Sequence, residues 1–171
     1  MKAATFVTAM AAAVLLSGCA QFYPVGIVAG TSTAGDVSAR MGEPAEKISQ
    51  GNGDSVWYYP GGRMGRQTFA LRIGANGVVG TVEERLTEAN VNKIVADKTT
   101  MKEVRELMGP PSHVAFFPLK QHTSWEYPMI PGNPSYWMIL WVNFSEDGIV
   151  REVLYMRDPE KDYMNPGDEW S

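Results

Sequence analysis

Apolar and polar residues alternate with the two-residue period of β-strands in two separate stretches of the chain. Each stretch follows a short segment with helical spacing. Turns at Gly51-Asn52-Gly53, Asn76-Gly77 and Asp147-Gly148 separate neighbouring strands and are typical of hairpins. The pattern predicts strands near residues 45–50, 55–60, 67–73 and 78–84 in the first stretch, and near 112–117, 123–127, 137–144 and 149–157 in the second.

The helical segment before each set of strands begins with a capping pattern. Thr33 and Thr100 can each accept a hydrogen bond from an early backbone N–H, and Asp36 and Glu103 stand three residues later, as a capping box requires. A further helix, capped by Thr87, is expected just before the second of these helices. The corresponding part of the first stretch, residues 25–28, is shorter, so we expect its leading helix to be truncated.

Both helices are predicted to end at the same phrase, Met-Gly-x-Pro. Gly42 and Gly109 suit the left-handed position that follows a helix. Pro44 and Pro111, two residues further on, cannot continue a helix. We therefore interpret Met-Gly-x-Pro as a signal that ends each helix.

The two stretches resemble one another residue by residue. At an offset of 67, residues 27–44 and 94–111 share eight identities in 18 positions, where chance gives about one. The offset becomes 68 for Trp57, Tyr59 and Pro60, which match residues 125, 127 and 128. It becomes 71 for Gly77 and Val79, which match residues 148 and 150. The shared positions of the first stretch are Ile27, Val28, Ala29, Thr33, Val37, Met41, Gly42, Pro44, Trp57, Tyr59, Pro60, Gly77 and Val79.

This repetition predicts a tandem duplication of the α+β class. Each repeat is expected to be a helix pair packed on an antiparallel β-meander of three to four strands. The repeats are placed at residues 25–86 and 87–158, with a flexible tail at residues 159–171. In this interpretation Asp158 and the acidic residues after it are exposed turn or tail charges.

Large aromatic residues mark one strand of each repeat. Trp57 with Tyr59, and Trp125 with Tyr127, occupy alternate positions and so face the same side of a strand. Such a face either packs in the core or forms an exposed binding platform, and core packing is the preferred interpretation. These four residues, with Gly42, Pro44, Gly109 and Pro111, form the structural signature of the repeat.

Residues 136–144 are apolar at almost every position, so both faces of the predicted strand should be covered. The cover is either the other repeat or a partner. We therefore take Tyr136, Trp137 and Trp141 as candidate partner-binding residues.

The first residues of the chain have a different composition from the rest. Lys2 supplies a positive start, residues 3–15 are apolar, and Leu16-Ser17-Gly18-Cys19 follows. This order is typical of an export signal over residues 1–18, and the apolar run is shorter than the ~20 residues that span a bilayer. The alternative is a buried N-terminal helix.

Leu16-Ser17-Gly18-Cys19 resembles the lipobox of bacterial lipoproteins, which implies lipidation of Cys19 and a lipidated tether over residues 19–24. Cys19 is the only cysteine, so no internal disulfide can form. The residue after it is Ala20 rather than the Asp that retains enteric lipoproteins in the inner membrane. The expected location is the outer membrane of a Gram-negative bacterium, on its periplasmic face.

The charge of the chain gives no support for nucleic acid or for an anionic membrane surface as a partner. The chain has 15 Lys+Arg and 19 Asp+Glu, a formal net charge of −4. Loss of Lys2 with the signal leaves 14 against 19, or −5. We expect the membrane to be reached through the acyl chains on Cys19 rather than through charge.

The second repeat also resembles a known family. The residues that carry the resemblance are Leu86, Thr87, Ala89, Asn90, Val91, Lys93, Ile94, Thr100, Val104, Met108, Gly109, Pro111, Trp125, Tyr127, Asp147 and Gly148. They are similar to the SmpA/OmlA (BamE-like) module of small outer-membrane lipoproteins. The resemblance implies two helices packed on an antiparallel sheet and a non-catalytic scaffolding role in the periplasm.

The doubled layout departs from that single module. It resembles β-lactamase inhibitory protein, in which tandem copies make one long concave sheet. Secreted inhibitors of that kind are stabilised by internal disulfides, which this chain cannot form. The resemblance therefore leaves two functions open, a scaffold for envelope assembly or integrity and a periplasmic inhibitor of a β-lactamase or lysozyme-like hydrolase.

The sequence offers little catalytic chemistry. His113 and His122 could be neighbours on a hairpin, but two histidines without cysteine or a nearby carboxylate pattern are a weak metal site. No phosphate-binding loop or nucleophile–base arrangement is present. We expect no enzyme, no metal and no cofactor.

The hairpin at residues 60–66 is the other candidate for partner binding. It carries Arg63, Met64 and Arg66 in a chain of negative net charge. Its arginines are either solvated or contact lipid headgroups or an acidic patch on a partner. The partner is expected to be another envelope protein, and the oligomeric state stays open.

Overall fold

A computed structural model describes residues 23–130 and 137–158, apart from the side chains of Arg63 and Met64. Several predictions therefore concern parts of the chain outside the described residues. These are the signal at 1–18, Cys19 and most of its tether, Tyr136, and the tail at 159–171.

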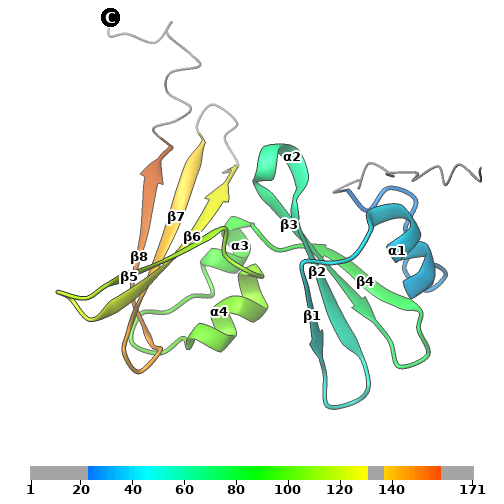
Figure 1. Cartoon of the computed structure of the whole chain (residues 1–171), viewed down its shortest axis with the longest axis horizontal. Helices are drawn as coiled ribbons and strands as arrows, with labels where there is room; N and C mark the ends of the chain where they lie inside the picture. The colour runs from blue at the N-terminus through cyan, green and yellow to red at the C-terminus, as the bar shows by residue number, and fades with distance from the viewer. Residues whose placement is uncertain (1–22, 131–136, 159–171) are drawn as a thin grey trace, which may run out of the picture.

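The described chain forms two four-stranded antiparallel sheets (Figure 1). The first half contains α1 (Ala34–Met41), β1 (Glu46–Ser49), β2 (Ser55–Gly61), α2 (Gly62–Gly65), β3 (Gln67–Ile73) and β4 (Val79–Glu84). The second half contains α3 (Glu88–Val91), α4 (Met101–Met108), β5 (His113–Phe117), β6 (His122–Met129), β7 (Met138–Ser145) and β8 (Val150–Arg157). Each sheet is a meander with its strands in chain order, β1-β2-β3-β4 and β5-β6-β7-β8.

The predicted fold class, with a helix pair on each meander, is wrong, because the molecule is mostly sheet. The first half has one eight-residue helix, α1, and α2 is a single turn within the β2–β3 hairpin. The second half has α4 and only the four-residue α3. Thr87 caps α3 as expected, but Asn92 ends the helix after one turn. So short a segment gains too few backbone hydrogen bonds to offset the cost of helix nucleation.

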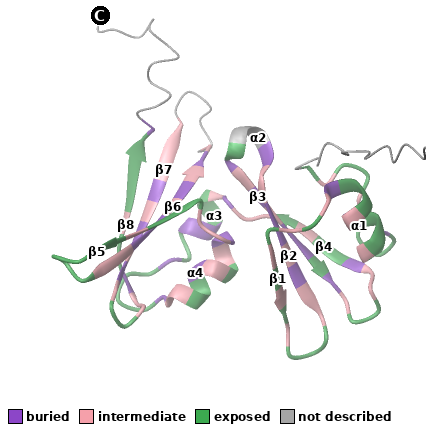
Figure 2. Cartoon of the chain, viewed as in Figure 1, coloured by how far each residue is buried: buried purple, intermediate pink, exposed green. Residues whose placement is uncertain are grey.

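The strands lie within about two residues of their predicted positions, as alternation on a half-covered sheet allows. Each sheet has an irregularity at the same place in its third and fourth strands, between Arg72 and Ile73 and between Asn143 and Phe144. Figure 2 shows exposed residues along the outer strands β5 and β8, whereas buried residues gather on β6 and β7.

Both predicted capping boxes are present. The Thr33 hydroxyl accepts from the Asp36 N–H at 3.2 Å, and the Asp36 carboxylate accepts from the Thr33 N–H at 2.8 Å. Thr100 and Glu103 make the same pair of bonds at 3.2 and 2.7 Å. These bonds hold the pKa of each carboxyl below its usual value.

The predicted left-handed helix ends are only half right. Gly42 and Gly109 have φ of 76° and 81°, but their ψ values are −163° and −168°. This extended conformation at positive φ is open essentially to glycine alone. It sends the chain straight out of the helix, so that the residue before each proline can be extended.

The elements form a stack of layers in the order α1, first sheet, α3 and α4, second sheet (Figure 1). Val37 and Met41 of α1 pack on one face of the first sheet. Val104 and Met108 of α4 pack on one face of the second. The outward side of α4 meets the remaining face of the first sheet, so α4 contacts both sheets.

Equivalent backbone hydrogen bonds close the two halves. The Gly30 N–H donates to the Val79 carbonyl at 2.7 Å, as the Asp97 N–H does to the Val150 carbonyl at 2.8 Å. The Val79 and Val150 N–H groups donate back to Ser32 and Thr99 at 2.8 and 2.9 Å. These shared contacts support the predicted duplication, which stays a prediction.

The paired tyrosines of the repeat signature explain why it joins a helix end to a strand. The Tyr59 hydroxyl donates to the Gly42 carbonyl at 3.0 Å, and the Tyr127 hydroxyl donates to the Gly109 carbonyl at 3.1 Å. Both tyrosines are buried. Each bond satisfies a carbonyl that the end of a helix leaves without an intrahelical partner.

We predict that Tyr127→Phe lowers the free energy of unfolding by about 1 kcal/mol, because it leaves the buried Gly109 carbonyl without its donor. Tyr59→Phe should have a similar effect through Gly42. Tyr155→Phe is the matched control, since Tyr155 is 43% exposed, and should change stability by less than about 0.5 kcal/mol. Urea unfolding measures all three, and equal losses for Tyr127→Phe and Tyr155→Phe would contradict the assigned role of the bond.

The same burial predicts alkaline sensitivity. Burial raises the pKa of Tyr59 from 10.0 to about 12, and it also raises the pKa of Tyr127. A raised pKa in the folded state gives stability that is fully present below the unfolded pKa and is lost as the pH rises through the folded one. The urea midpoint should therefore fall between pH 10 and about 12. The fall should be shallower in Tyr59→Phe, and an identical slope in that variant would count against the prediction.

Candidate functional site: the open face of the second sheet

The second sheet has one face packed on α3 and α4 and one face that no described element covers. Paired residues on antiparallel strands point to the same side, so the register defines this uncovered face. We call it the open face. Its residues are His113, Ala115, Phe117, His122, Ser124, Glu126, Pro128, Ile139, Trp141, Asn143, Glu152, Leu154 and Met156.

The equivalent face of the first sheet is covered by α4 and the glycine that follows it. A Cβ placed on Gly109 would lie 2.9 Å from Thr68 Cγ2 and 3.0 Å from Tyr58 Cδ1. The Arg105 guanidinium contacts both carboxylate oxygens of Glu46, with the Nε at 3.0 Å from each and the Nη2 at 2.7 Å from Oε2. The first sheet therefore already uses this face to hold a helix.

The repeat offsets show how the open face differs from its covered equivalent. Thr68 corresponds to Ile139 and Ala70 to Trp141, at an offset of 71. These changes add apolar surface just where the first sheet keeps small side chains that admit α4. Glu126 replaces Tyr58 beside Trp141, its partner across the strand pair.

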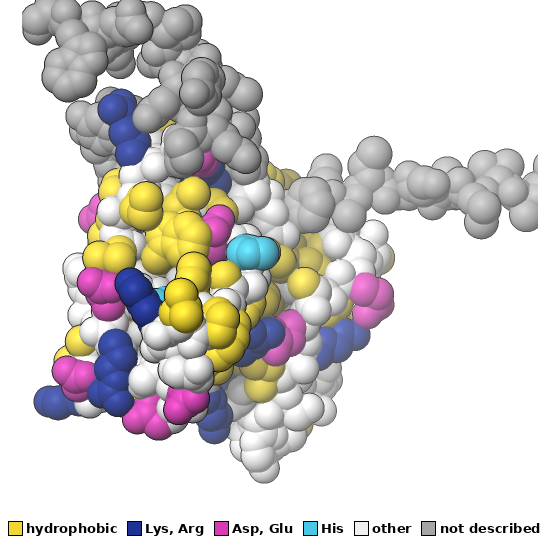
Figure 3. Space-filling view, turned by 60° about the vertical axis from the view of Figure 1, so that its left-hand side comes forward, with side chains coloured by type: hydrophobic (Ala, Val, Ile, Leu, Met, Phe, Trp, Pro, Cys, Tyr) yellow, Lys and Arg dark blue, Asp and Glu magenta, His cyan; other side chains and the backbone are white. Residues whose placement is uncertain are grey.

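The apolar part of the open face continues onto the last strand. Leu154 is 40% exposed and Met156 53% exposed, and they pair with Trp141 and Ile139. Figure 3, in which the second sheet comes forward, shows apolar side chains gathered here with a histidine beside them. Contiguous exposed apolar surface of this kind is typical of interaction sites.

Polar groups on the open face are left without partners. The Trp141 Nε1–H and the Ser124 hydroxyl are buried and make no hydrogen bond within residues 23–130 and 137–158. The half-buried Glu126 carboxylate has no ion pair in this part of the chain. The register places no Lys or Arg on this face of the described strands. The face is therefore apolar and acidic.

The β5–β6 hairpin extends the apolar surface at one edge. Phe116 is 57% exposed, and Leu119 at the tip is fully exposed. The ring of Phe117 lies 4.9 Å from that of His122. This stacking leaves the Phe117 ring in place for a partner to contact.

The histidines are not brought together. His113 pairs with Glu126, and His122 pairs with Phe117, four positions further along β5. That separation is about 13 Å along the strand. Among the described residues, no cluster of three or more His, Cys, Asp or Glu could hold a metal ion.

Arg66 and Trp137, two other predicted site residues, join the halves of the molecule. Arg66 is buried, forms an ion pair with Asp158, and donates to the Met138 carbonyl at 3.2 Å. Its guanidinium lies 4.5 Å from the centre of the Trp137 ring. Asp158 is also buried, so the prediction that it is an exposed tail charge is wrong. A charge so buried needs a partner, and the partner comes from the other half.

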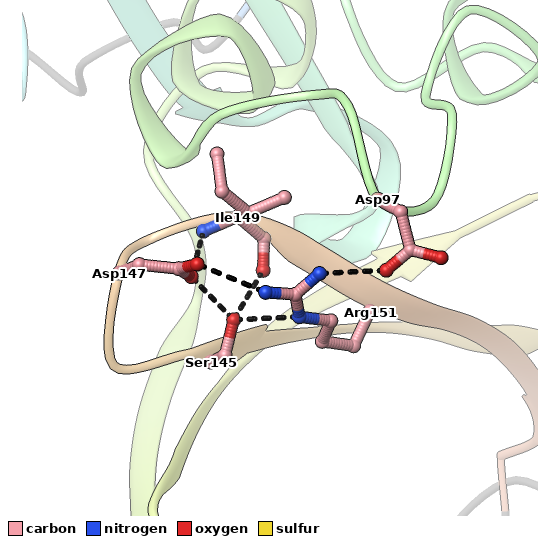
Figure 4. A network of polar contacts seen from close by, with 5 residues as sticks. All are labelled: Asp97, Ser145, Asp147, Ile149 and Arg151. Atoms are coloured by element: carbon pink, nitrogen blue, oxygen red, sulfur yellow. Dashed lines mark hydrogen bonds and ion pairs between the residues drawn. The ribbon is translucent and has the colours of Figure 1, made fainter.

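A polar network fastens the β7–β8 turn to the loop before α4 (Figure 4). Arg151 donates to Asp97 at 2.7 Å and to Asp147 at 2.9 Å, and its Nε lies 2.8 Å from the Ser145 hydroxyl. The bond to Asp97 raises the pKa of Arg151, and hydrogen bonds from the Ser145 hydroxyl and the Ile149 N–H lower the pKa of Asp147. The first half has Gly80 and Gly30 at the equivalent positions of Arg151 and Asp97, so the network belongs to the second half alone.

Sequence reasoning selected Trp141 but missed Glu126, Leu154 and Met156. The signal for Leu154 and Met156 was present, because the two alternate along the last strand. The sequence does not reveal the strand register, and the register decides that Leu154 and Met156 lie on the same face as Trp141. No described helix is long and apolar enough to cross a membrane.

The fold defines a protein of two stacked sheet units. No family model matches the chain, and no curated protein matches it. One solved structure that it resembles is a DUF4309 family protein (YjgB) from Bacillus subtilis subsp. subtilis str. 168. The identity is 17%, the match covers 78% of this chain and 84% of that one, and the TM-score is 0.31. The predicted likeness to SmpA/OmlA stays a prediction.

Proposed function

We propose that this chain is a non-catalytic, lipid-anchored binding protein on the periplasmic face of the outer membrane. In this proposal Cys19 carries the anchor, and the open face docks another envelope protein. The role is support of outer-membrane assembly or of envelope integrity, as the SmpA/OmlA resemblance implied.

One observation carries the proposal. The same face of the repeated sheet is covered by α4 in the first half and left uncovered in the second, where it is also more apolar. A surface built to receive a helix within the chain is thereby presented to the outside. Its partner would complete the stack of layers.

The chemistry of the face indicates the kind of partner. The helix that covers the first sheet places Arg105 against a carboxylate, Glu46. On the open face the carboxylate is Glu126, on the neighbouring strand, next to Trp141. We therefore expect a helix with an apolar stripe and a Lys or Arg that reaches Glu126.

The size of the face limits the strength of the contact. Three strands of the sheet have eight residues and β5 has five. With strands about 4.8 Å apart, the face covers at most roughly 19 Å by 26 Å. That is about 500 Å², below the ~800 Å² per partner of a stable interface. A stable partner should therefore also contact the exposed tip of the β5–β6 hairpin.

The inhibitor alternative depended on one long concave sheet made by both repeats. The two sheets have separate hydrogen-bonded strand orders, and α3 and α4 lie between them. No observation on the described residues favours that alternative, so the binding protein is the function proposed.

We predict that Leu154→Glu with Met156→Glu weakens partner binding at least tenfold, because it places two charges in the apolar part of the open face. Val95→Glu is the matched control, since Val95 is 48% exposed on a loop away from this face. The full chain is cross-linked in cells and purified from solubilised envelope, and the affinity of the captured protein is then measured. A partner retained equally by both variants would overturn the docking assignment.

The anchor is tested separately. Labelled palmitate should be incorporated into the full chain in a Gram-negative host and should be absent from Cys19→Ala. Membrane fractionation should release that variant in soluble form, since without the acyl chains the acidic surface has no attraction for an anionic membrane. A label that persists in Cys19→Ala would refute lipidation at Cys19. It would not bear on the proposal that the open face docks a partner.

A further inference from the structure

A second surface, separate from the open face, lies between the two halves. Here the first sheet and the helices of the second half leave a cleft of about 450 Å³. Its size falls within the range of small-molecule sites in proteins. Its walls come from both halves, so a ligand held there would touch both.

The lining of the cleft includes a polar group that bonds to no other described residue, the hydroxyl of Tyr58. Tyr58 is only 2% exposed, and it lines the cleft. Its hydroxyl makes no hydrogen bond within the described part of the chain, in contrast to the neighbouring Tyr59. Burial is the main cause that raises the pKa of Tyr58, so the hydroxyl stays a neutral donor at neutral pH. The ring of Tyr58 is buried, but its hydroxyl is not one of the fully enclosed polar atoms, so it is accessible from the cleft as a donor to a ligand.

Cations from three different elements also line the cleft. They are Arg72 on β3, Arg85 after β4 and Lys93 after α3. The Nη1 of Arg85 lies 3.0 Å from a Glu83 carboxylate oxygen, but its Nε is buried and has no partner among the described residues. Arg72 is 3.9 Å from Asp54, and among the described residues the Lys93 ammonium donates only to the Asn90 side chain. Each cation thus keeps donors available.

The carboxylates at the cleft do not neutralise these cations. Glu103 is held by Thr100 in the capping box, and Glu106 lies 3.8 Å from Lys102. Within the described ranges, no ion pair joins Glu103 or Glu106 to Arg72, Arg85 or Lys93. The cleft is therefore lined by three cations and two carboxylates that form no ion pair with one another, while Glu83 and Asp54 at its margin pair with Arg85 and Arg72.

We propose that this cleft binds a small organic anion, with its carboxylate or phosphate group on the Arg85 guanidinium and the Tyr58 hydroxyl, and with Lys93 and Arg72 as further donors. Guanidinium groups suit both kinds of oxyanion. The anion would join the first sheet to the α3–α4 region. Binding should therefore raise the thermal stability of the whole chain, by an amount that grows with the logarithm of the ligand concentration above the dissociation constant.

The test uses the full chain in detergent with three probes at constant ionic strength: inorganic phosphate, succinate and the cation spermidine. Calorimetric titration and the unfolding temperature are recorded for each. Phosphate or succinate should bind and raise the unfolding temperature, and the stronger of the two identifies the anionic group. Spermidine should do neither. Binding of spermidine alone, or of no probe at millimolar concentration, would overturn the proposal.

Two variants locate the anion. Arg85→Gln should weaken binding about tenfold or more, because it removes a charged donor. Tyr58→Phe should weaken it about three- to tenfold while it leaves the buried ring in place. Arg40→Gln is the matched control, an arginine on α1, which packs on the opposite face of the first sheet, and should leave the affinity unchanged. Equal affinity in wild type and Arg85→Gln, or equal weakening in Arg40→Gln, would refute the site.

Discussion

The structure depends on α4 packing on two sheets at once. One side of this eight-residue helix supplies Val104 and Met108 to the core of the second sheet. The other side meets the first sheet through Arg105 and through Gly109 at the helix end. At that glycine, the Tyr127 hydroxyl holds the carbonyl while Tyr58 and Thr68 leave no room for a Cβ. Contacts within the second repeat and contacts between the repeats therefore meet at Gly109. The recurring Met-Gly-x-Pro sequence thus ends the helix and also allows close packing against the other sheet.

This arrangement makes the two ends of the molecule unequal. At one end α1 covers the first sheet, and at the other no helix of the described chain lies over the second sheet. A stack built from similar units always leaves one unit without a neighbour, and such ends are usually polar. Here the end is apolar around Trp141 and Leu154 and carries the Glu126 carboxylate, which forms no ion pair with any other residue that the structure describes. Because this end is apolar where such ends are usually polar, we assign partner binding to the open face.

The strands could be predicted from the sequence because alternation on a half-buried sheet is a local signal. The capping boxes were predictable for the same reason, since Thr33 and Asp36 are only three residues apart. The helix pairs were not, because one-turn segments such as α3 carry cap residues without enough length to form a longer helix. The ψ values of Gly42 and Gly109 also escaped prediction, because they depend on where the chain goes next.

The candidate sites were less predictable than the fold. Trp141 was found because it lies in a continuous apolar run. The faces to which Leu154 and Glu126 belong depend on strand register, which residue type alone does not reveal. The cleft between the halves was not predicted at all, because Tyr58, Arg85 and Lys93 come from different elements. A cleft lined by residues of several elements has no signature in a single sequence.

The ion pair between Arg66 and Asp158 has a consequence for how the chain is made. The two residues are 92 positions apart, and both are buried. Leaving one member of a buried pair alone costs several kcal/mol. During synthesis on the ribosome, Arg66 can reach Asp158 only after β8 has emerged. This contact between the two halves therefore forms late, after the first sheet, α4 and most of the second sheet have been made.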